Sequence, residues 1–330
     1  MKVTVYSSHN FDKQFLLDAN QSKHELVFVE PKLTMDTVDL AKGSTAVCLF
    51  VSDDASAPIL EKLARLGVKY VALRSAGYNH IDLKAAAENN LLVARVPAYS
   101  PNSVAEHTIA LILALNRNLI LADQQIKRNN FSLDNLVGFN LAGKTAGVIG
   151  TGKIGSIVAR ILSSFGCKVL AYDKFENNDL KNNFKVEYTT LNSLYNRSNI
   201  ITLHVPLNSE TKYLINKDSI KQMREGVMLI NTGRGALINT PNVIQGLKEN
   251  KIRWFGADVY EKEEPWIFED HSKDEMTDPV LKELMSFKNV LVTGHQAFLT
   301  DEALMNIGTT TIYNLDCFAK EEVTKNYLNY

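Results

Sequence analysis

Three residues that could together act on a small carboxylic acid follow separate apolar segments: Arg234 in "GVMLINTGRGALIN", Glu263 in "FGADVYEKEEPW" and His295 in "VLVTGHQAFLT". An arginine binds a carboxylate through two fixed N–H donors. A histidine, with an unperturbed pKa of about 6.5, exchanges a proton near neutral pH. A neighbouring carboxylate favours the charged imidazolium, and Glu263 is the candidate for that partner. The three residue types suit a reaction in which one group holds the acid and another moves a proton.

Each of these residues also has a structural interpretation. Arg234 could be a solvated turn residue, Glu263 lies in the charged run "EKEEP", and a histidine at a strand end is often a satisfied structural residue. Their positions favour function, because open α/β sheets bind ligands at the carboxyl ends of the strands. Asp258 ends the predicted strand between those of Arg234 and His295, so three successive strand ends each offer a charged or ionisable side chain at one edge.

A nucleotide-binding pattern precedes them. Gly150, Gly152 and Gly155 have G-x-G-x-x-G spacing between an apolar strand and the helix-forming "SIVARILSSFG". The glycines allow a tight turn, close approach of a pyrophosphate and tight helix–strand packing, and the helix N-terminus offers N–H groups to the anion. The pattern alone also occurs in ligand-free turns. Asp173 ends the next strand at about the twenty-residue spacing of a ribose-binding acid, which favours NAD over NADP, although Lys174 beside it favours the opposite. Hydride transfer to a 2-keto acid is the chemistry predicted.

Short β-branched segments alternate with helical patterns along the whole chain, which predicts parallel sheets built from βαβ units. The predicted strands before residue 100 are "KVTVYSS", "HELVFVE", "STAVCLFV", "KYVALRS" and "LLVARVP". Those after residue 140 are "KTAGVIG", "CKVLAYD", "NIITLHVP", "GVMLINTG", "IRWFGADV" and "NVLVTGH". Because the glycine pattern begins only at Gly150, a separate α/β segment must precede the nucleotide-binding part. The amphipathic segment after Thr300 is expected to pack back on that first part.

A long helix is predicted between the two series. Pro97 and Pro101 end the preceding strand, and Ser103 with Glu106 forms an S-x-x-E capping box. The helix should continue to about Lys127. Its apolar residues cover nearly the whole circumference, so it must be buried on several sides, either between domains or against another subunit.

Composition excludes several classes of protein. The chain has 330 residues, 45% of them hydrophobic, and a formal net charge of −1, which is enough for two domains and gives no basic surface for nucleic acid or an anionic membrane. Cys48, Cys167 and Cys317 stand far apart, as expected of reduced thiols in a cytoplasmic protein. The most apolar segment, "TIALILALNRNLILA", is too interrupted to span a bilayer. The histidines lack metal-ligand spacing, so no metal is expected.

The complete set of motifs resembles the D-isomer-specific 2-hydroxyacid dehydrogenases over essentially the whole chain, and within that family its fermentative bacterial members. The matching segments are "ALRSAGYNHIDL", "VPAYSPNSVAEH", "GVIGTGKIG", "HVPLNSET", "NTGRGALIN", "DVYEKEE" and "GHQAFLT". The resemblance implies two Rossmann-like, doubly wound parallel-sheet domains, with an NAD-binding domain (101–297) inserted into a substrate domain (1–100, completed by 298–330). It implies reversible reduction of pyruvate to D-lactate by NADH.

The resemblance also implies roles for individual residues. Arg234 would bind the substrate carboxylate, His295 would donate the proton, and Glu263 would pair with His295. The remaining substrate contacts implied are Ala76 and Gly77 through their backbone N–H groups, and Tyr99 and Phe298 around a small pocket. The cofactor contacts implied are Gly150, Gly152, Lys153, Ile154 and Gly155 at the pyrophosphate, Asp173 at the ribose, Val205 and Pro206 at the adenine, and Thr232, Gly233 and Asp258 near the nicotinamide.

The helix beginning near Ser103 matches the family's subunit contact, which implies a homodimer or homotetramer. His80 and Gly233 depart from residues common in relatives. Two alternatives remain open at this point. One keeps the reaction but takes a bulkier 2-keto acid, such as phenylpyruvate or a branched-chain acid, with Tyr99, Phe298 and Trp266 as the aromatic side chains concerned. The other is a non-enzymatic module that senses NAD.

Overall fold

The computed structural model describes residues 1–329 and divides into two compact units. Unit 1 contains Met1–Ser100 together with the segment from Leu299 onward, and unit 2 is the continuous stretch Pro101–Phe298. The second boundary lies one residue later than expected, so Phe298 belongs to unit 2 and not to the unit that the C-terminal segment completes.

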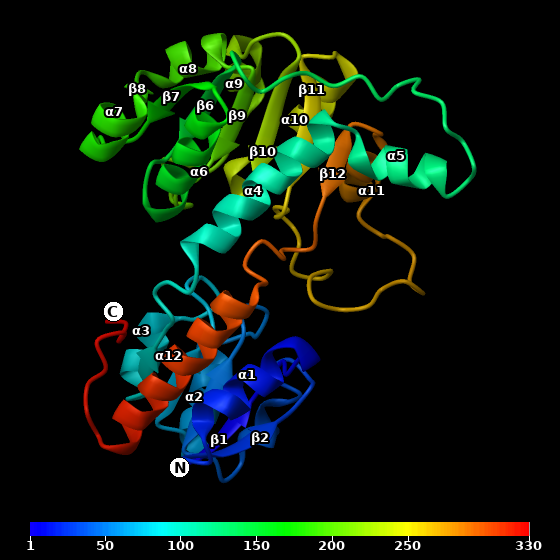
Figure 1. Ribbon diagram of the computed structural model, residues 1–330. Helices are drawn as coiled ribbons and strands as arrows, with labels where there is room; N and C mark the ends of the chain where they lie inside the picture. Colours follow the sequence, from blue (N-terminus) through cyan, green and yellow to red (C-terminus); the bar gives the residue numbers. More distant parts are fainter. Residues whose placement is uncertain (330) are drawn as a thin grey trace. The chain divides into compact units, whose positions relative to one another are not determined.

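Unit 1 is built on a five-stranded, all-parallel sheet with the strand order β2-β1-β3-β4-β5, of which Figure 1 labels β1 and β2. Its strands are short apolar runs: β1 (Lys2–Val5), β2 (Glu25–Phe28), β3 (Ala46–Leu49), β4 (Tyr70–Leu73) and β5 (Leu92–Ala94). In the register of the sheet, Val3 of β1 pairs with Leu26 on one side and with Ala46 on the other. This strand order is one of the two common orders of doubly wound folds.

Helices cover both faces of that sheet, which explains why β3 and β4 are apolar at every position. One face packs against α1 (Asn10–Asn20) and α12 (Asp301–Ala319), with Leu16 and Phe318 in its core. The other face packs against η1 (Val38–Ala41), α2 (Ala57–Arg65) and α3 (Leu83–Glu88). The C-terminal helix therefore belongs to the core of unit 1.

Unit 2 is built on a seven-stranded, all-parallel sheet with the order β12-β11-β10-β9-β6-β7-β8. The strands are β6 (Thr145–Ile149), β7 (Lys168–Tyr172), β8 (Glu187–Tyr188), β9 (Ile200–Leu203), β10 (Val227–Asn231), β11 (Ile252–Ala257) and β12 (Val290–Val292). The chain builds outward from β6 in one direction and then returns to add β9 on the other side. The order reverses between β6 and β9, which is where open α/β sheets bind ligands.

The two faces of the unit 2 sheet carry separate apolar cores. α4 (Pro101–Asn116), α6 (Lys153–Ser164) and α7 (Asn178–Phe184) cover one face. The other face carries α8 (Leu191–Arg197), α9 (Lys217–Gln222), η2 (Gly235–Leu237), α10 (Thr240–Lys248) and α11 (Pro279–Ser286). All strand ends that carry candidate site residues therefore open at one edge of a sheet that is covered on both faces.

The helix expected from Ser103 to about Lys127 is wrong in two respects. It begins at Pro101, whose fixed φ suits a first helical position, so Ser103 lies inside the first turn. It also breaks: α4 ends at Asn116, Asn118 takes a left-handed conformation, and α5 (Leu119–Ile126) continues at a 58° bend. No single helix among residues 1–329 is long and apolar enough to cross a membrane, and only the bent pair α4 and α5 reaches that length and composition together.

Candidate active site

Three neighbouring strands of unit 2 place the candidate catalytic residues at the same sheet edge. Arg234 follows β10, Asp258 follows β11 and His295 follows β12, and these strands are adjacent and parallel. The turn bearing Arg234 is closed by Asn231, whose side-chain amide donates to the Arg234 carbonyl at 2.9 Å. Gly235 is required there, because an added Cβ would lie 2.1 Å from the Tyr260 carbonyl carbon. The tight turn therefore depends on glycine.

His295 and Glu263 form a direct pair. The Nδ1 atom of His295 lies 2.8 Å from Oε1 of Glu263, and only 22% and 19% of the two side chains are exposed. The other carboxylate oxygen, Oε2, accepts the backbone N–H of Tyr260 at 2.9 Å, which fixes the direction of the carboxylate. Because Nδ1 faces a carboxylate, it carries a hydrogen, and Nε2 is the ring atom that can exchange a proton with a substrate.

The backbone of His295 is unusual and is held by Asp258. Its φ is +54°, a left-handed conformation that is uncommon outside glycine. The His295 N–H donates to the Asp258 carbonyl at 2.8 Å, and the Asp258 carboxylate accepts the N–H groups of Gln296 at 2.9 Å and Ala297 at 2.8 Å. The Thr293 hydroxyl donates to the same carboxylate at 2.5 Å. Asp258 thus fastens the turn that presents the imidazole.

This use of Asp258 differs from the nicotinamide contact that the resemblance implies. The side chain is 1% exposed, and its oxygens serve the turn after β12. Nε2 of His107, on α4, lies 3.0 Å from the Thr293 hydroxyl and 3.4 Å from Asp258 Oδ1. Burial raises the pKa of Asp258, but the hydrogen bonds from His107, Thr293 and the two backbone N–H groups outweigh it and lower the pKa below its usual value. The carboxylate is therefore charged, and His107 belongs to its network.

Aromatic rings restrict the space beside the imidazole. The ring of Phe268 lies 5.8 Å from that of His295 and 6.4 Å from that of Phe298 in an edge-to-face arrangement. Phe298 is buried. Trp266, which was considered with the same group, has its ring 5.3 Å from that of His271. Phe268 was not among the residues predicted from the sequence, and it is an aromatic neighbour of His295.

The glycine pattern has the geometry that a dinucleotide needs. Gly150 has φ +92°, and an added Cβ would lie 2.7 Å from the His204 backbone. A Cβ on Gly155 would lie 1.9 Å from the Gly150 carbonyl oxygen, so the helix packs directly on the turn. A Cβ on Gly152, in contrast, would meet nothing within 4 Å. Gly152 is the N-cap of α6, and no side-chain cap hydrogen bond occupies the N–H groups of the first turn, which begins with Lys153 and Ile154. These features fit a pyrophosphate.

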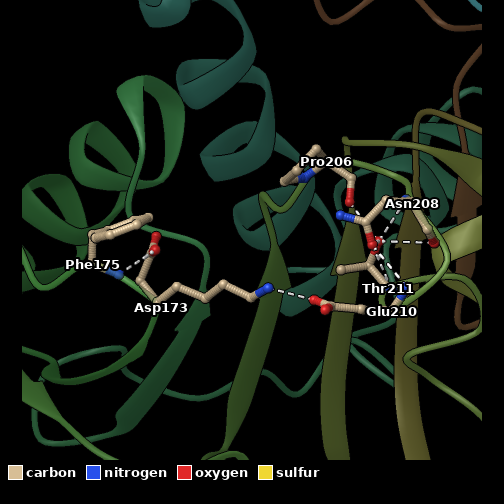
Figure 2. A network of polar contacts seen from close by, with 7 residues as sticks. Asp173, Phe175, Pro206, Asn208, Glu210 and Thr211 are labelled. Carbon is tan, nitrogen blue, oxygen red and sulfur yellow. Dashed lines mark hydrogen bonds and ion pairs between the residues drawn. The ribbon is translucent and has the colours of Figure 1, made fainter.

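Asp173 lies after β7, next to the same turn. Its Oδ2 accepts the Thr151 N–H at 2.6 Å. Its Oδ1 accepts the Phe175 N–H at 3.0 Å (Figure 2). On the other side of β6, Val205 and Pro206 follow β9. The carboxylate at the end of β7 and the apolar pair at the end of β9 therefore flank the point where the strand order reverses.

Thr232 and Gly233 follow β10. The Thr232 hydroxyl is 2.8 Å from that of Thr108 on α4, and the Gly233 N–H donates to the Asn231 side chain at 3.1 Å. Burial lowers the pKa of His204, which follows β9, to about 3, so this ring is neutral. Its Nε2 is 2.5 Å from the Thr202 hydroxyl. These groups shape the edge of the sheet without carrying charge.

The other proposed substrate contacts lie in unit 1. Ala76 and Gly77 follow β4, where Arg95 donates to the Ala76 carbonyl at 2.7 Å and the Ser75 hydroxyl donates to the Gly77 carbonyl at 2.6 Å. The peptide bond between Ala76 and Gly77 is trans, so the Gly77 N–H points away from the carbonyl that Arg95 holds. The Tyr99 carbonyl accepts a hydrogen bond from the Asn306 side chain at 2.7 Å. The backbone of this loop is thus oriented by side chains that the sequence did not indicate.

Among residues 1–329 no group of three or more histidine, cysteine or acidic side chains is placed to hold a metal ion. The sheet edge of unit 2 instead combines a dinucleotide turn, a guanidinium and a histidine–carboxylate pair. A site of this kind defines a nicotinamide-nucleotide-dependent dehydrogenase.

Comparison with known proteins gives the family. Residues 109–297 match the family described as D-isomer specific 2-hydroxyacid dehydrogenase, NAD binding domain. The chain is 48% identical to D-lactate dehydrogenase of Escherichia coli over 99% of this chain and 100% of that protein. Its fold is similar to that of the pyruvate reductase of Chlamydomonas reinhardtii, with a TM-score of 0.95, 44% identity and coverage of 99% and 98%.

A third similar structure is D-lactate dehydrogenase from Aquifex aeolicus complexed with NAD and lactic acid, with a TM-score of 0.87, 35% identity and coverage of 99% and 98%. The chain belongs to the D-isomer-specific 2-hydroxyacid dehydrogenases, and its unit 2 contains the NAD-binding domain of that family.

Proposed function

We propose that this chain is an NAD-dependent D-lactate dehydrogenase that reversibly reduces pyruvate to D-lactate. The observation that carries the proposal is the 2.8 Å pair between His295 and Glu263 at the carboxyl edge of an NAD-binding sheet. In this role Arg234 holds the substrate carboxylate through its guanidinium. Arg234 follows β10, which is separated by β11 from β12, the strand before His295. His295 gives the proton on Nε2 to the oxygen of the reduced carbon, and Glu263 holds the ring in the orientation that this transfer needs.

The resemblance to the family also assigns substrate contacts to Ala76, Gly77 and Tyr99 in unit 1 and to Phe298 in unit 2. The N–H of Gly77 is turned away from Arg95 and is available to a carboxylate oxygen, with the N–H of Ala76 beside it. Tyr99 and Phe298 would limit the size of the group on the keto carbon. The edge-to-face contact of Phe298 with Phe268 near His295 favours a methyl group, and so pyruvate, over a bulkier side chain.

NADH, when bound, supplies the hydride. The residues that would hold it, as the resemblance to the family implies, are Gly150, Gly152 and Gly155 with the N–H groups of Lys153 and Ile154 at the pyrophosphate, Asp173 at the adenosine ribose, Val205 and Pro206 at the adenine, and Thr232, Gly233 and Asp258 toward the nicotinamide. Because Asp258 is taken up by the turn after β12, its contribution there would be to position that turn.

The test is a substrate panel with chiral analysis of the product. NADH and pyruvate should give D-lactate, with kcat/KM higher for pyruvate than for phenylpyruvate or a branched-chain 2-keto acid. A higher value for one of the bulkier acids would reassign the substrate. NADH binding without turnover of any short 2-keto acid would support a sensing module instead.

Two substitutions test the assigned roles. His295→Ala should lower kcat by about 10²- to 10⁴-fold, the range of general acid catalysis, while NADH affinity stays within about twofold. His271→Ala is the matched control, because His271 also pairs with a carboxylate, Asp274, at 2.8 Å but in an exposed loop. Arg234→Lys should mainly raise KM for pyruvate, since an ammonium cannot make the two-pronged contact. Equal losses in the two histidine variants would contradict the role of His295.

We also propose a homodimer or homotetramer. The family resemblance assigns the contact to the helix beginning near Ser103, but α4 is largely buried within its own unit. The exposed apolar side chains lie farther along, on α5 and the segment that follows it: Leu119, Ile120, Ile126, Phe131, Leu133 and Val137. A subunit contact there would cover them. In analytical ultracentrifugation the unchanged chain should sediment as a dimer or tetramer, and Ile120→Glu should dissociate toward monomers.

The three cysteines support a reducing compartment, such as the cytoplasm. Cys48, Cys167 and Cys317 are all unpaired and buried. Such thiols are usual in proteins kept reduced after synthesis. Fractionation of cells that produce the protein would test the assignment.

A further inference from the structure

Lys174 stands directly after the ribose-side carboxylate of Asp173 and forms an ion pair with Glu210. Figure 2 shows Glu210 on the loop that also contains Pro206, facing the segment that carries Asp173 and Phe175. The two loops follow β7 and β9, the strands on either side of β6. The ion pair therefore joins the two segments that flank the proposed adenosine site.

Glu210 is carried by an ordered turn. The side chain of Asn208 accepts the N–H groups of Glu210 at 2.9 Å and Thr211 at 3.0 Å. The Thr211 hydroxyl donates to the Pro206 carbonyl at 2.6 Å (Figure 2). The backbone that bears the Glu210 carboxylate is therefore tied to Pro206, at the proposed adenine site, so the carboxylate is held in reach of Lys174.

The partner of Lys174 matters because NAD and NADP differ only at the adenosine 2′ position. A lysine beside the ribose-binding acid could bind a 2′-phosphate, which carries a charge of roughly −1.5 to −2 at pH 7. With its ammonium paired to Glu210, Lys174 has no uncompensated charge to offer. Glu210 itself adds a second negative charge near Asp173. Both effects disfavour a 2′-phosphate.

We infer that Glu210 is a specificity-determining residue that disfavours NADP by holding Lys174 away from the 2′ position beside Asp173. The inference rests on the proposed cofactor site and deepens it. It removes the ambiguity that Lys174 introduced into the sequence, where a basic residue stands next to an acid typical of NAD-binding proteins. The positive charge of Lys174, after β7, is compensated by the carboxylate of Glu210, after β9.

The expected size of the effect is modest, because the pair is exposed. The side chains of Lys174 and Glu210 are 67% and 64% exposed, and ion pairs of this kind change an equilibrium by roughly 1.4- to fivefold. The pairing and the charge of Glu210 act in the same direction on a doubly charged phosphate. Removal of the Glu210 charge should therefore raise the ratio of NADPH to NADH use by roughly three- to tenfold.

The experiment compares Glu210→Gln with the unchanged chain, using kcat/KM for NADPH and for NADH with the same keto acid. A second readout, independent of turnover, is the affinity for 2′,5′-ADP relative to 5′-AMP by calorimetry. Glu225→Gln is the matched control, because Glu225 pairs with Lys251 at 2.9 Å before β10, at the opposite edge of the same sheet. Its ratio should equal that of the unchanged chain.

Lys174→Met makes the test a double-mutant cycle. If Glu210 acts mainly by holding Lys174, most of the gain from Glu210→Gln disappears when Lys174 is also replaced, and only the part due to the charge of Glu210 itself remains. A gain of the same size in both backgrounds, or no gain in either readout, overturns the inference. Failure of the proposed function is separate: it would appear as an unchanged chain that neither binds NADH nor reduces a keto acid with it.

Discussion

Replacing Asp258 by asparagine tests whether one buried carboxylate holds the catalytic turn. Asparagine has almost the same shape, but its amide group donates where the carboxylate accepts. If the remaining oxygen faces Thr293 and Gln296, the new NH₂ group faces the N–H of Ala297, which in the unchanged chain donates to Asp258 Oδ2 at 2.8 Å. In either orientation of the amide, at least one buried backbone N–H loses its acceptor.

The magnitude follows from these contacts. A buried donor left without a partner costs about 1–3 kcal/mol, and the surviving bonds lose their charge assistance, which adds about 1 kcal/mol. The loss in the free energy of unfolding should therefore be about 2–4 kcal/mol. For a unit of this size each kcal/mol lowers the melting temperature by about 2–4 °C, so the transition of unit 2 should fall by roughly 5–15 °C. The kcat should fall as well, because His295 depends on the same turn.

The assay is calorimetry, which measures the melting temperature of each variant, with Asp278→Asn as the control. Asp278 caps α11 by accepting the N–H groups of Val280 and Leu281, and asparagine is an equally good cap. Its other oxygen accepts the Tyr260 hydroxyl at 2.8 Å, and the asparagine NH₂ can donate to that hydroxyl instead, so the variant should lose about 1 kcal/mol or less. The pKa of Asp258 is lowered in the folded chain, so its charge stabilises the fold above the ordinary aspartate pKa, and that contribution is lost as pH falls through the lowered value. The difference in melting temperature between the unchanged chain and Asp258→Asn should therefore narrow below about pH 4. Equal melting temperatures for the two asparagine variants at pH 7 would refute the reasoning.

Three further predictions concern other parts of the site. Arg95→Met removes a charged donor from the Ala76 carbonyl and should raise KM for pyruvate by about tenfold with a smaller change in kcat, whereas Arg95→Lys should restore part of the loss; an unchanged KM would contradict it. Glu263→Gln should lower kcat by about tenfold, because the ring of His295 loses the charged acceptor that orients it at 2.8 Å, and an unchanged kcat would remove Glu263 from its role. The pKa of His204 is lowered to about 3, so its protonation favours the unfolded chain, and stability present above pH 6.5 is lost as pH falls toward 3. When the pH is lowered from 7.5 to 5, the free energy of unfolding of His204→Gln should fall by about 1–2 kcal/mol less than that of the unchanged chain. Denaturant unfolding at the two pH values measures this difference.

The sheets could be predicted from sequence because their strands are apolar at nearly every position. All strands except β8 were expected, and β8 is only the two residues Glu187–Tyr188, too short to give a pattern. The break between α4 and α5 was missed because the apolar residues resume after Asn118, and three polar residues alone do not distinguish a helix break from an exposed helical turn. In the structure Asn118 takes a left-handed conformation there, and the side chain of Asn116 bonds both the N–H and the carbonyl of Phe139, a residue that no spacing rule connects with this turn.

The candidate site was predicted as residue types at strand ends, and its supporting contacts were not. A histidine, an arginine and an acid after successive strands can be read from sequence because parallel strands share an edge. The contacts of Asp258 with His107 and of Lys174 with Glu210 cannot be predicted from sequence. Each joins residues from separate elements whose pairing follows no spacing rule. Arg95 was invisible for the same reason.

Unit 1 is completed by the last helix of the chain, and this governs the order in which the protein can mature on the ribosome. Unit 2 is one uninterrupted stretch, so its core can form as soon as that stretch has emerged. The sheet of unit 1 emerges first, yet α1 covers only part of the face bearing Val3, Cys48 and Tyr70 until Ile312 and Phe318 arrive. The N-terminal part of the nascent chain must therefore wait, with apolar surface open to chaperones or to aggregation, while nearly two hundred residues are synthesised after it.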